Sequence, residues 1–415
     1  MTLRRTIAIL ALAGAAPVAG PVAAQQDGAA HEWGEKSAPE FEPAYPAQTR
    51  APLDPSGLAL ETERIATGLV HPWAVEEMPG GTGYLVTERP GRLRHVAPDG
   101  TVSEPISGVP EVENREPDSY WPTQAGLLDV KLGPDFAETR HVYFTYAKPM
   151  DEGRSATAAA RGVLSEDRTA LTQVEDIWVQ SPPSETRMHY GSRIVFDGEG
   201  RAFITTGEHS SHEEREFAQH LDKTYGKIIR VNLDGSIPQT NPFVGVEGAD
   251  DAIWSYGHRN VQGAVMHRGT LYTIEHGPAG GDELNMPLPA RNYGWPIVAY
   301  GKRYDGPAIG TGEPRWAGFQ EPLYYWDPVI APGDAAIYSG APFAEWEGDM
   351  LIGGLVAEGL IRLELQNGSV VAAEERMLTR LGRVRDVEVL ADGALMLTTD
   401  FDDGALVRVT PGGAG

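Results

Sequence analysis

Five polar segments, each expected to lie between short strands, carry side chains that could bind or transfer charge. They contain Gln124; His189 and Arg193; Arg259 and Asn260; Gly277, Pro278, Asp282 and Glu283; and Arg383 with Arg385. The last two arginines are two positions apart, so they face the same side of an expected strand. Each segment alone is a weak signal, because a lone histidine between strands is more often a hydrogen-bonded loop residue than a base.

Taken together, these side chains could perform acid–base chemistry on an anionic ligand beside a metal ion. His189 is the candidate for proton abstraction, because the unperturbed pKa of histidine lies close to neutral pH. Arg259, Arg383 and Arg385 could hold a multiply anionic ligand through bidentate contacts. The segment "HGPAGGDELN", residues 276–285, could turn several carbonyl and carboxylate oxygens toward one point, as calcium requires. A tight acidic turn is the alternative.

The elements that must position these side chains are short strands that recur along the chain. After residue 60, β-branched and aromatic runs alternate with Gly, Pro, Asp and Asn clusters. Strand openings of one kind begin at Gly83, His141, Arg201, Thr270, Gly348 and Gly393. Fixed hairpins with insertions of variable length are typical of a propeller, so an all-β, six-bladed β-propeller is predicted, with a large pair of β-sandwiches as the alternative. Insertions in a propeller gather around the central channel, where the polar segments would converge.

Three regions are expected along the chain. Residues 1–24 have the pattern of a signal peptide, because Arg4 and Arg5 precede an apolar run and small residues end at Ala24. Residues 25–58 are a Pro- and Ala-rich leader or linker, and residues 59–415 are the propeller domain. Cleavage after Ala24 would leave no membrane-spanning segment, so a periplasmic or secreted protein is expected.

The composition excludes several classes of function. The chain contains no cysteine, so it has no disulfide, no thiol catalysis and no thiolate metal site. Asp plus Glu number 59 against 34 Lys plus Arg, which gives a formal net charge of −25. Such a charge argues against binding to nucleic acid or to an anionic membrane.

Six ordered motifs carry a resemblance to a known family. They are "QAGLLDV", "HYGSRIVFD", "GKIIRVNLDGSIPQTNPF", "SYGHRNVQG", "HGPAGGDELNMPLPARNYGWP" and "GRVRDVEVLADGALMLTTD". The set resembles the glucose/sorbosone dehydrogenase family, soluble aldose dehydrogenases that use pyrroloquinoline quinone (PQQ). The likeness runs from about Ala66 to Val409, nearly the whole expected domain. It implies a six-bladed propeller with the quinone at the mouth of the channel.

The resemblance also implies a role for each motif residue. His189 resembles the general base, and Arg259 a cation beside the cofactor that also serves catalysis. Gln124, Asn260, Arg383 and Arg385 resemble the contacts to PQQ, the two last meeting its carboxylates. The carbonyls of Gly277 and Pro278 resemble ligands of a calcium ion. Gln124, Tyr300 and Trp326 are the candidates for contact with the substrate.

The implied reaction is oxidation of an aldose or sorbosone-type sugar at C1 to the lactone or acid, with hydride passing to the quinone. An external electron acceptor, a cytochrome or a quinone, would then reoxidise the cofactor. Two positions depart from the family pattern, because Val356 and Ala279 stand where relatives often have basic residues. A calcium-dependent lactone hydrolase and a non-catalytic binding propeller are therefore the alternative functions.

Overall fold

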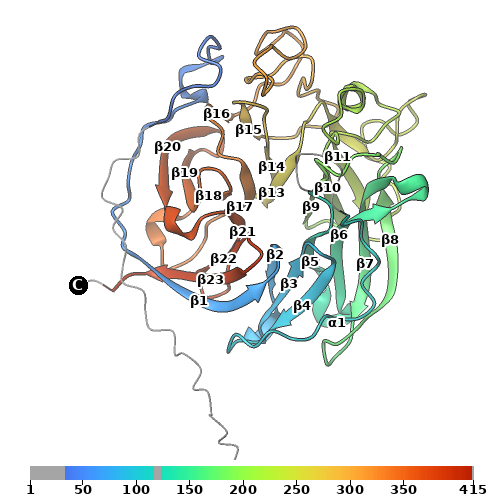
Figure 1. Cartoon of the computed structure of the whole chain (residues 1–415), viewed down its shortest axis with the longest axis vertical. Helices are drawn as coiled ribbons and strands as arrows, with labels where there is room; N and C mark the ends of the chain where they lie inside the picture. Colours follow the sequence, from blue (N-terminus) through green and yellow to red (C-terminus); the bar gives the residue numbers. More distant parts are fainter. Residues whose placement is uncertain (1–32, 116–122, 414–415) are drawn as a thin grey trace, which may run out of the picture.

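The strands of this protein form a closed ring of antiparallel sheets. The computed structural model describes residues 33–115 and 123–413, so the predicted signal peptide, residues 1–24, lies outside the described residues. Within the described ranges the strands form six sheets, which are arranged around a central channel (Figure 1). The prediction of an all-β, six-bladed β-propeller is confirmed.

Each blade is numbered in chain order, and its strands run outward from the channel. Blade 1 contains β2 (Pro72–Glu77), β3 (Tyr84–Glu88) and β4 (Arg92–Val96); blade 2 contains β5 (Leu127–Leu132), β6 (His141–Pro149), β7 (Ser155–Leu164) and β8 (Leu171–Val179). Blade 3 contains β9 (Gly191–Phe196), β10 (Arg201–Thr206), β11 (Lys227–Asn232) and β12 (Ile253–Tyr256); blade 4 contains β13 (Val261–His267), β14 (Thr270–Glu275), β15 (Asp282–Asn285) and β16 (Tyr324–Trp326). Blade 5 contains β17 (Pro332–Ile337), β18 (Met350–Gly354), β19 (Leu360–Gln366) and β20 (Val370–Met377); blade 6 contains β21 (Val384–Val389), β22 (Leu395–Thr399), β23 (Gly404–Pro411) and β1 (Leu60–Leu69).

In the part of the chain that the structure describes, helical structure is confined to short turns. They are α1 (Phe136–Thr139) and the 3₁₀ turns η1 (Pro46–Gln48), η2 (Pro79–Gly81), η3 (Asp151–Gly153), η4 (Glu214–Gln219), η5 (Ala344–Trp346) and η6 (Thr379–Leu381). In the described part of the chain, no helix has the length and apolar character needed to cross a membrane.

Blade 6 is completed by the two ends of the domain. Strand β1 pairs with β23 in antiparallel register, from Leu60 opposite Pro411 to Leu69 opposite Gly404. Figure 1 shows the blue β1 beside the red β23 near the C-terminus. The outermost strand of the last blade is thus the first strand of the chain, and this pairing closes the ring without an unpaired junction.

The recurring strand openings correspond to the second strand of each blade. These strands are β3, β6, β10, β14, β18 and β22. In blades 1 to 3 the second strand carries a threonine whose hydroxyl donates to a carbonyl at the start of the next blade: Thr87 to Leu128, Thr145 to Ser192, and Thr205 to Val261. These buried hydroxyls join neighbouring blades beside the channel, which explains a threonine in the middle of an apolar strand.

Residues 33–54 pack along the outer edges of blades 4 and 5. The hydroxyls of Tyr45 and Thr49 donate to the carbonyls of Leu323 and Tyr325, at 2.7 and 2.8 Å. Leu53 then forms a parallel bridge with Glu374 of β20. The part of the predicted leader that the structure describes is therefore a strap on the propeller surface, and β1 follows directly after it (Figure 1).

The innermost strands β2, β5, β9, β13, β17 and β21 lie nearest the centre of the ring (Figure 1). Each shows an irregular register with its neighbour at its first residues, as between Pro72 and Ala74 or between Val384 and Asp386. β-Bulges of this kind bend a strand and redirect side chains, and they are frequent beside active sites. The irregular ends all lie at the same end of the channel.

Candidate active site

The end of the channel at which the innermost strands begin contains a cavity of about 530 Å³. Its lining comes from the first residues of the innermost strands and from two turns in the blades, the turn before the first strand and the turn after the second strand. The turns before the first strand include His71, Gln124, Asn260 and Arg383, and the turns after the second strand include Arg89, His276, Val356 and Asp400. Because the two strands are antiparallel neighbours, the start of one lies beside the end of the other. The hairpin geometry therefore delivers side chains from distant parts of the sequence to one cavity.

His189 lies beside this cavity, between the lining residues Met188 and Tyr190. Its Nδ1 donates to the Oε1 of Glu208 at 2.9 Å, and its main-chain N–H donates to the Oε1 of Gln124 at 2.8 Å. Within the described residues, the Nε2 atom has no hydrogen-bond partner. The backbone φ of His189 is +47°, which lies in the left-handed region, so the backbone is strained at this residue.

The His189–Glu208 pair is buried, and its protonation states follow from that burial. Burial and then the charge of Arg259 lower the pKa of His189 below its ordinary value, against the opposing effect of Glu208. Burial pushes the pKa of Glu208 upward, but the hydrogen bond and charge of His189, with Arg259, hold it below its ordinary value. At neutral pH the pair is thus a neutral imidazole and a carboxylate, the arrangement that a general base requires.

Arg259 is a second buried charge near His189, although it does not line the cavity itself. Its Nη1 donates to the carbonyl of His276 at 2.9 Å, and its guanidinium carbon lies 5.2 Å from the ring centroid of Trp295. Its Nε is buried without a hydrogen-bond partner among the described residues. Because an unpaired N–H in a buried site is costly, this atom is suited to a ligand oxygen or an ordered water.

Gln124, Asn260 and Gln262 form a polar wall of the cavity. The Oδ1 of Asn260 accepts from the N–H of Gly191 at 3.0 Å, and Gln262 donates to the Gly191 carbonyl at 3.1 Å. Gln124 accepts from the His189 main chain, as described above. These amides fix the strand that follows His189 and still line the cavity.

Arg383, Arg385 and Asp400 also line the cavity, next to Gln262. Arg385 is buried, and it donates to Asp400 Oδ2 at 2.6 Å and to Gln262 Oε1 at 2.9 Å, so all three of its nitrogens already have a protein partner. The side chain of Arg383 is 40% exposed, and its contact with Asp400 is 3.5 Å. The charges of Arg385 and the hydrogen bond of His71 outweigh burial and hold the pKa of Asp400 well below its ordinary value. This part of the lining is net cationic once Arg89, another lining residue, is included.

The turn that contains Gly277 and Pro278 follows the lining residue His276. Neither carbonyl accepts a hydrogen bond from the described residues, so both oxygens are available to a cation or to water. Asp282 accepts the N–H groups of Gly277, Ile330 and Ala331 at 2.7 to 2.8 Å, which fixes this turn against the loop before β17. Among residues 33–115 and 123–413, no group of three or more His, Asp or Glu is arranged to hold a metal ion.

The two positions that depart from the family pattern lie in different surroundings. Val356 lines the cavity and is 59% exposed, so it forms part of the rim. Ala279 does not line the cavity; it pairs with Lys302 in an antiparallel bridge, and the Lys302 ammonium forms an ion pair with Glu40 at 2.6 Å. The rim position is therefore the one where a missing cation would directly change the cavity.

The structure does not bring Tyr300 and Trp326 to the cavity. Tyr300 is 2% exposed, stacks on Tyr325 with ring centroids 4.1 Å apart, and donates its hydroxyl to Glu321. Trp326 is part of an apolar cluster between blades 4 and 5, and its indole N–H donates to Glu374. Both aromatic side chains are packing residues near the surface strap, which removes the reason for placing them at a substrate wall.

The lining residues that were not singled out from the sequence include His71, Trp73, Arg89, Gln262 and His276. His276 was present only as a letter in a motif, and burial lowers its pKa to about 3, so its imidazole is neutral. The signal that could have found the others is positional. His71 precedes the first strand of blade 1, and Arg89 follows the second strand, which are the same two places that supply Asn260 and Asp400 in other blades.

This geometry was compared with known proteins. The family described as Glucose / Sorbosone dehydrogenase has a model that matches residues 69–408. The chain belongs to this family. As a glucose/sorbosone dehydrogenase it is a sugar oxidoreductase, and the aldose sugar dehydrogenase YliI of Escherichia coli strain K12 is 40% identical to it over 356 residues, which cover 85% of this chain and 93% of the relative.

Solved structures of other glucose/sorbosone dehydrogenases have the same fold. The apo-form of the soluble aldose sugar dehydrogenase from Escherichia coli aligns with a TM-score of 0.80 at 39% identity, and the match covers 85% of this chain and 100% of that one. The PQQ-bound form of aldose sugar dehydrogenase from Streptomyces coelicolor aligns with a TM-score of 0.68 at 28% identity, covering 86% and 99%.

Proposed function

We propose that this chain oxidises an aldose or sorbosone-type sugar at C1 in the channel cavity, with PQQ as the hydride acceptor and calcium as its companion ion. The observation that carries the proposal is the buried His189–Glu208 pair, which lies beside a cavity lined by Arg89, Arg383 and Arg385. A relative of this family has been solved in a PQQ-bound form. The product would be the lactone, which hydrolyses to the acid.

The residues present fit an anionic quinone and a hard cation. Arg383 has unused donors at the rim, and the unpartnered Nε of Arg259 offers another donor from a buried position. The free carbonyls of Gly277 and Pro278 are the oxygen ligands that calcium prefers. When bound, the quinone supplies the hydride acceptor, and calcium supplies the polarisation that makes it electrophilic.

His189 acts as the general base in this scheme. Its Nε2 accepts the proton of the C1 hydroxyl, because its Nδ1 already donates to Glu208 and the ring is neutral at neutral pH. Glu208 then stabilises the imidazolium that forms. Glu208 orients His189 in the same way as the carboxylate of a serine protease orients its histidine, by fixing the tautomer of the ring.

Arg259 and Gln124 prepare the site for this proton transfer. The charge of Arg259 keeps His189 unprotonated before the sugar binds, and it would stabilise the alkoxide character that develops on the C1 oxygen. Gln124 holds the His189 main chain and lines the cavity, so it fixes the base from one side and can meet the substrate from the other. The reduced cofactor would then need an external electron acceptor, a cytochrome or a quinone.

Reconstitution tests the proposal. Purified apoprotein is mixed with PQQ and calcium, and reduction of an artificial electron acceptor is followed with a panel of aldoses. We expect sugar-dependent dye reduction that needs both PQQ and calcium. Failure to bind PQQ would favour a binding propeller without this chemistry, and hydrolysis of a lactone substrate with calcium alone would favour the hydrolase.

A further inference from the structure

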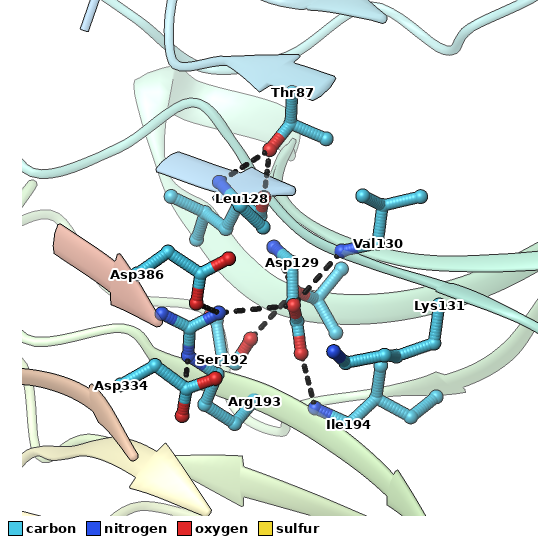
Figure 2. Close-up of polar contacts among 12 residues, drawn as sticks. Thr87, Leu128, Asp129, Val130, Lys131, Ser192, Arg193, Ile194, Asp334 and Asp386 are labelled. Atoms are coloured by element: carbon cyan, nitrogen blue, oxygen red, sulfur yellow. Dashed lines mark hydrogen bonds and ion pairs between the residues drawn. The ribbon is translucent and has the colours of Figure 1, made fainter. Parts of the chain in front are cut away.

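The channel below the cavity is filled by a buried ionic cluster centred on Arg193. This residue is the third of β9 and is 1% exposed. Its guanidinium lies among three carboxylates, with Asp129 at 3.0 Å, Asp386 at 3.1 Å and Asp334 at 3.3 Å. Figure 2 shows Asp129 on one side of the guanidinium and Asp334 and Asp386 on the other. The carboxylates occupy the third positions of β5, β17 and β21.

Each of these aspartates also joins two neighbouring blades. Asp129 accepts the N–H of Ile194 at 2.8 Å and so joins blades 2 and 3. Asp334 accepts the N–H of Ala264 at 3.1 Å, which joins blades 5 and 4, and Asp386 accepts the N–H of Val75 at 2.7 Å, which joins blades 6 and 1. Since all three carboxylates meet Arg193, the guanidinium links the three blade pairs at the axis of the ring.

The same guanidinium contacts the floor of the cavity. Its Nε donates to the carbonyl of Gln262 at 2.8 Å, and its Nη2 donates to the carbonyl of Arg385 at 3.3 Å. Its central carbon lies 4.0 Å from the ring centroid of Trp73. Trp73, Gln262 and Arg385 all line the cavity, and they come from blades 1, 4 and 6.

We propose that Arg193 is a positioning residue for the cavity, which fixes Trp73, Gln262 and Arg385 relative to one another and so sets the shape that the cofactor meets. The role depends on the planar fork of arginine, whose donors reach Asp129 and two carbonyls at once while its charge stays within 3.3 Å of Asp334 and Asp386. A lysine would keep the charge but would concentrate its donors at one point. The ligand's identity in this inference rests on the proposed function.

Positioning of the cavity residues explains this ionic cluster better than stabilisation of the fold does. Replacing a buried ion network by well-packed apolar side chains is often neutral or stabilising, so the network alone is weak support for a stabilising role. Groups behind the directly contacting residues of a site commonly change affinity or activity by about 10- to 100-fold when they are altered. A shift of about 1 Å in a positioned group can cost about 100-fold in rate.

The test compares Arg193→Lys with Arg362→Lys. Arg362 is a matched control, because it is also buried, pairs with Asp349 and Glu375 at 2.8 and 2.9 Å, and lies 5.9 Å from the Trp346 ring, but it does not line or support the cavity. Thermal unfolding of both apoproteins measures stability, quenching of tryptophan fluorescence measures PQQ affinity, and steady-state kinetics measure kcat and KM for the sugar. Crystal structures of the apoproteins show directly whether Trp73, Gln262 and Arg385, the floor of the cavity, have moved.

We expect Arg193→Lys to raise the Kd for PQQ by about tenfold or more and to lower kcat by about 10- to 100-fold, with KM for the sugar little changed. In its crystal structure, Trp73, Gln262 or Arg385 is displaced by about 1 Å. Arg362→Lys is expected to lower the melting temperature while Kd and kcat stay within about twofold of the unchanged chain.

A second variant covers the case in which Arg193→Lys does not fold. Asp334→Asn keeps the volume of the side chain and removes one of the charges that face Arg193. We expect this variant to weaken PQQ binding as Arg193→Lys does, with a rise in the Kd for PQQ of about three- to tenfold. An unmoved floor with unchanged affinity would overturn the positioning role. If the unchanged chain itself fails to bind PQQ, the proposed function is wrong, and the position of the floor in the apoprotein crystals still decides the role of Arg193.

Discussion

Arg383 and Arg385 are two positions apart, yet their surroundings give them different tasks. Arg385 is buried and already donates hydrogen bonds to Asp400 and Gln262, so its positive charge is paired within the protein. Arg383 is 40% exposed and has only long contacts to Asp400 and to the carbonyl of Leu355. A ligand carboxylate is therefore expected to gain more from Arg383, whereas Arg385 mainly maintains the wall.

Methionine substitutions separate these tasks. We expect Arg383→Met to raise the Kd for PQQ by roughly 10- to 100-fold, the loss of one charge-assisted contact, and to leave the melting temperature nearly unchanged. Arg385→Met leaves the buried Asp400 with weaker pairing, so we expect a loss on the order of 3 kcal/mol in the free energy of unfolding. Fluorescence titration and thermal unfolding of the apoproteins check both. Equal melting temperatures for the two variants would contradict the assignment.

The pH dependence of the reaction follows from the His189–Glu208 pair. The base must be unprotonated, so kcat/KM falls as the pH drops through the pKa of His189, which lies below its ordinary value. The negative charge of Glu208 raises the pKa of His189, so removing that charge lowers the pKa of His189 further. We therefore expect Glu208→Gln to shift the acidic limb of the profile to lower pH and to reduce the plateau rate by about tenfold or more.

Glu214→Gln is the control for this profile. Glu214 is a nearby carboxylate that accepts from Ser184 and has no contact with His189. Glu214→Gln should leave the acidic limb within about 0.3 pH units of that of the unchanged chain. A carboxylate that does not touch the imidazole has only a screened effect on the pKa of His189. An acidic limb that moves upward in Glu208→Gln would show that another group limits the rate.

At the scale of elements, the strands were predictable and their irregular ends were not. Alternating apolar residues and glycine turns indicated the second strand of each blade, such as β3 and β22, because these features are local. The register shift between Val384 and Asp386 depends on packing around the channel, which no local pattern records. This is why Gln124 and Arg383 could be proposed from motifs, whereas Trp73 in β2 and Arg89 in the turn after β3, which belong to no motif, could not.

The surface strap, residues 33–54, is an element whose contribution can be measured. It buries Phe41 and Ala51 and accepts or donates hydrogen bonds along blades 4 and 5. A chain that begins at Pro55 should lose on the order of 3 kcal/mol or more in the free energy of unfolding compared with one that begins at Trp33. Because the strap does not line the cavity, PQQ affinity should be unchanged.

Thermal and chemical unfolding of the two chains provide this measurement. Equal midpoints would mean that the strap adheres without stabilising the ring. Loss of PQQ affinity at full stability would mean that the strap reaches the site, contrary to the lining of the cavity.

At the scale of the whole molecule, the ring is defined by contacts between residues far apart in sequence. β1 and β23 close blade 6 across almost the whole domain, and Arg193 of β9 meets Asp129, Asp334 and Asp386, which come from three other strands. In the sequence each of these aspartates is one more acid in a chain of net charge −25. Their meeting at the axis follows from the closed topology, so only the assembled ring could identify them.

The central claim is that His189 is the base for sugar oxidation in this cavity. Its most direct test is the single-turnover reduction of bound PQQ by an aldose, followed by absorbance in the unchanged chain and in His189→Ala. We predict that the substitution lowers the rate of reduction by about 10²- to 10⁴-fold while the Kd for PQQ stays within about threefold. A rate equal to that of the unchanged chain would contradict the assignment.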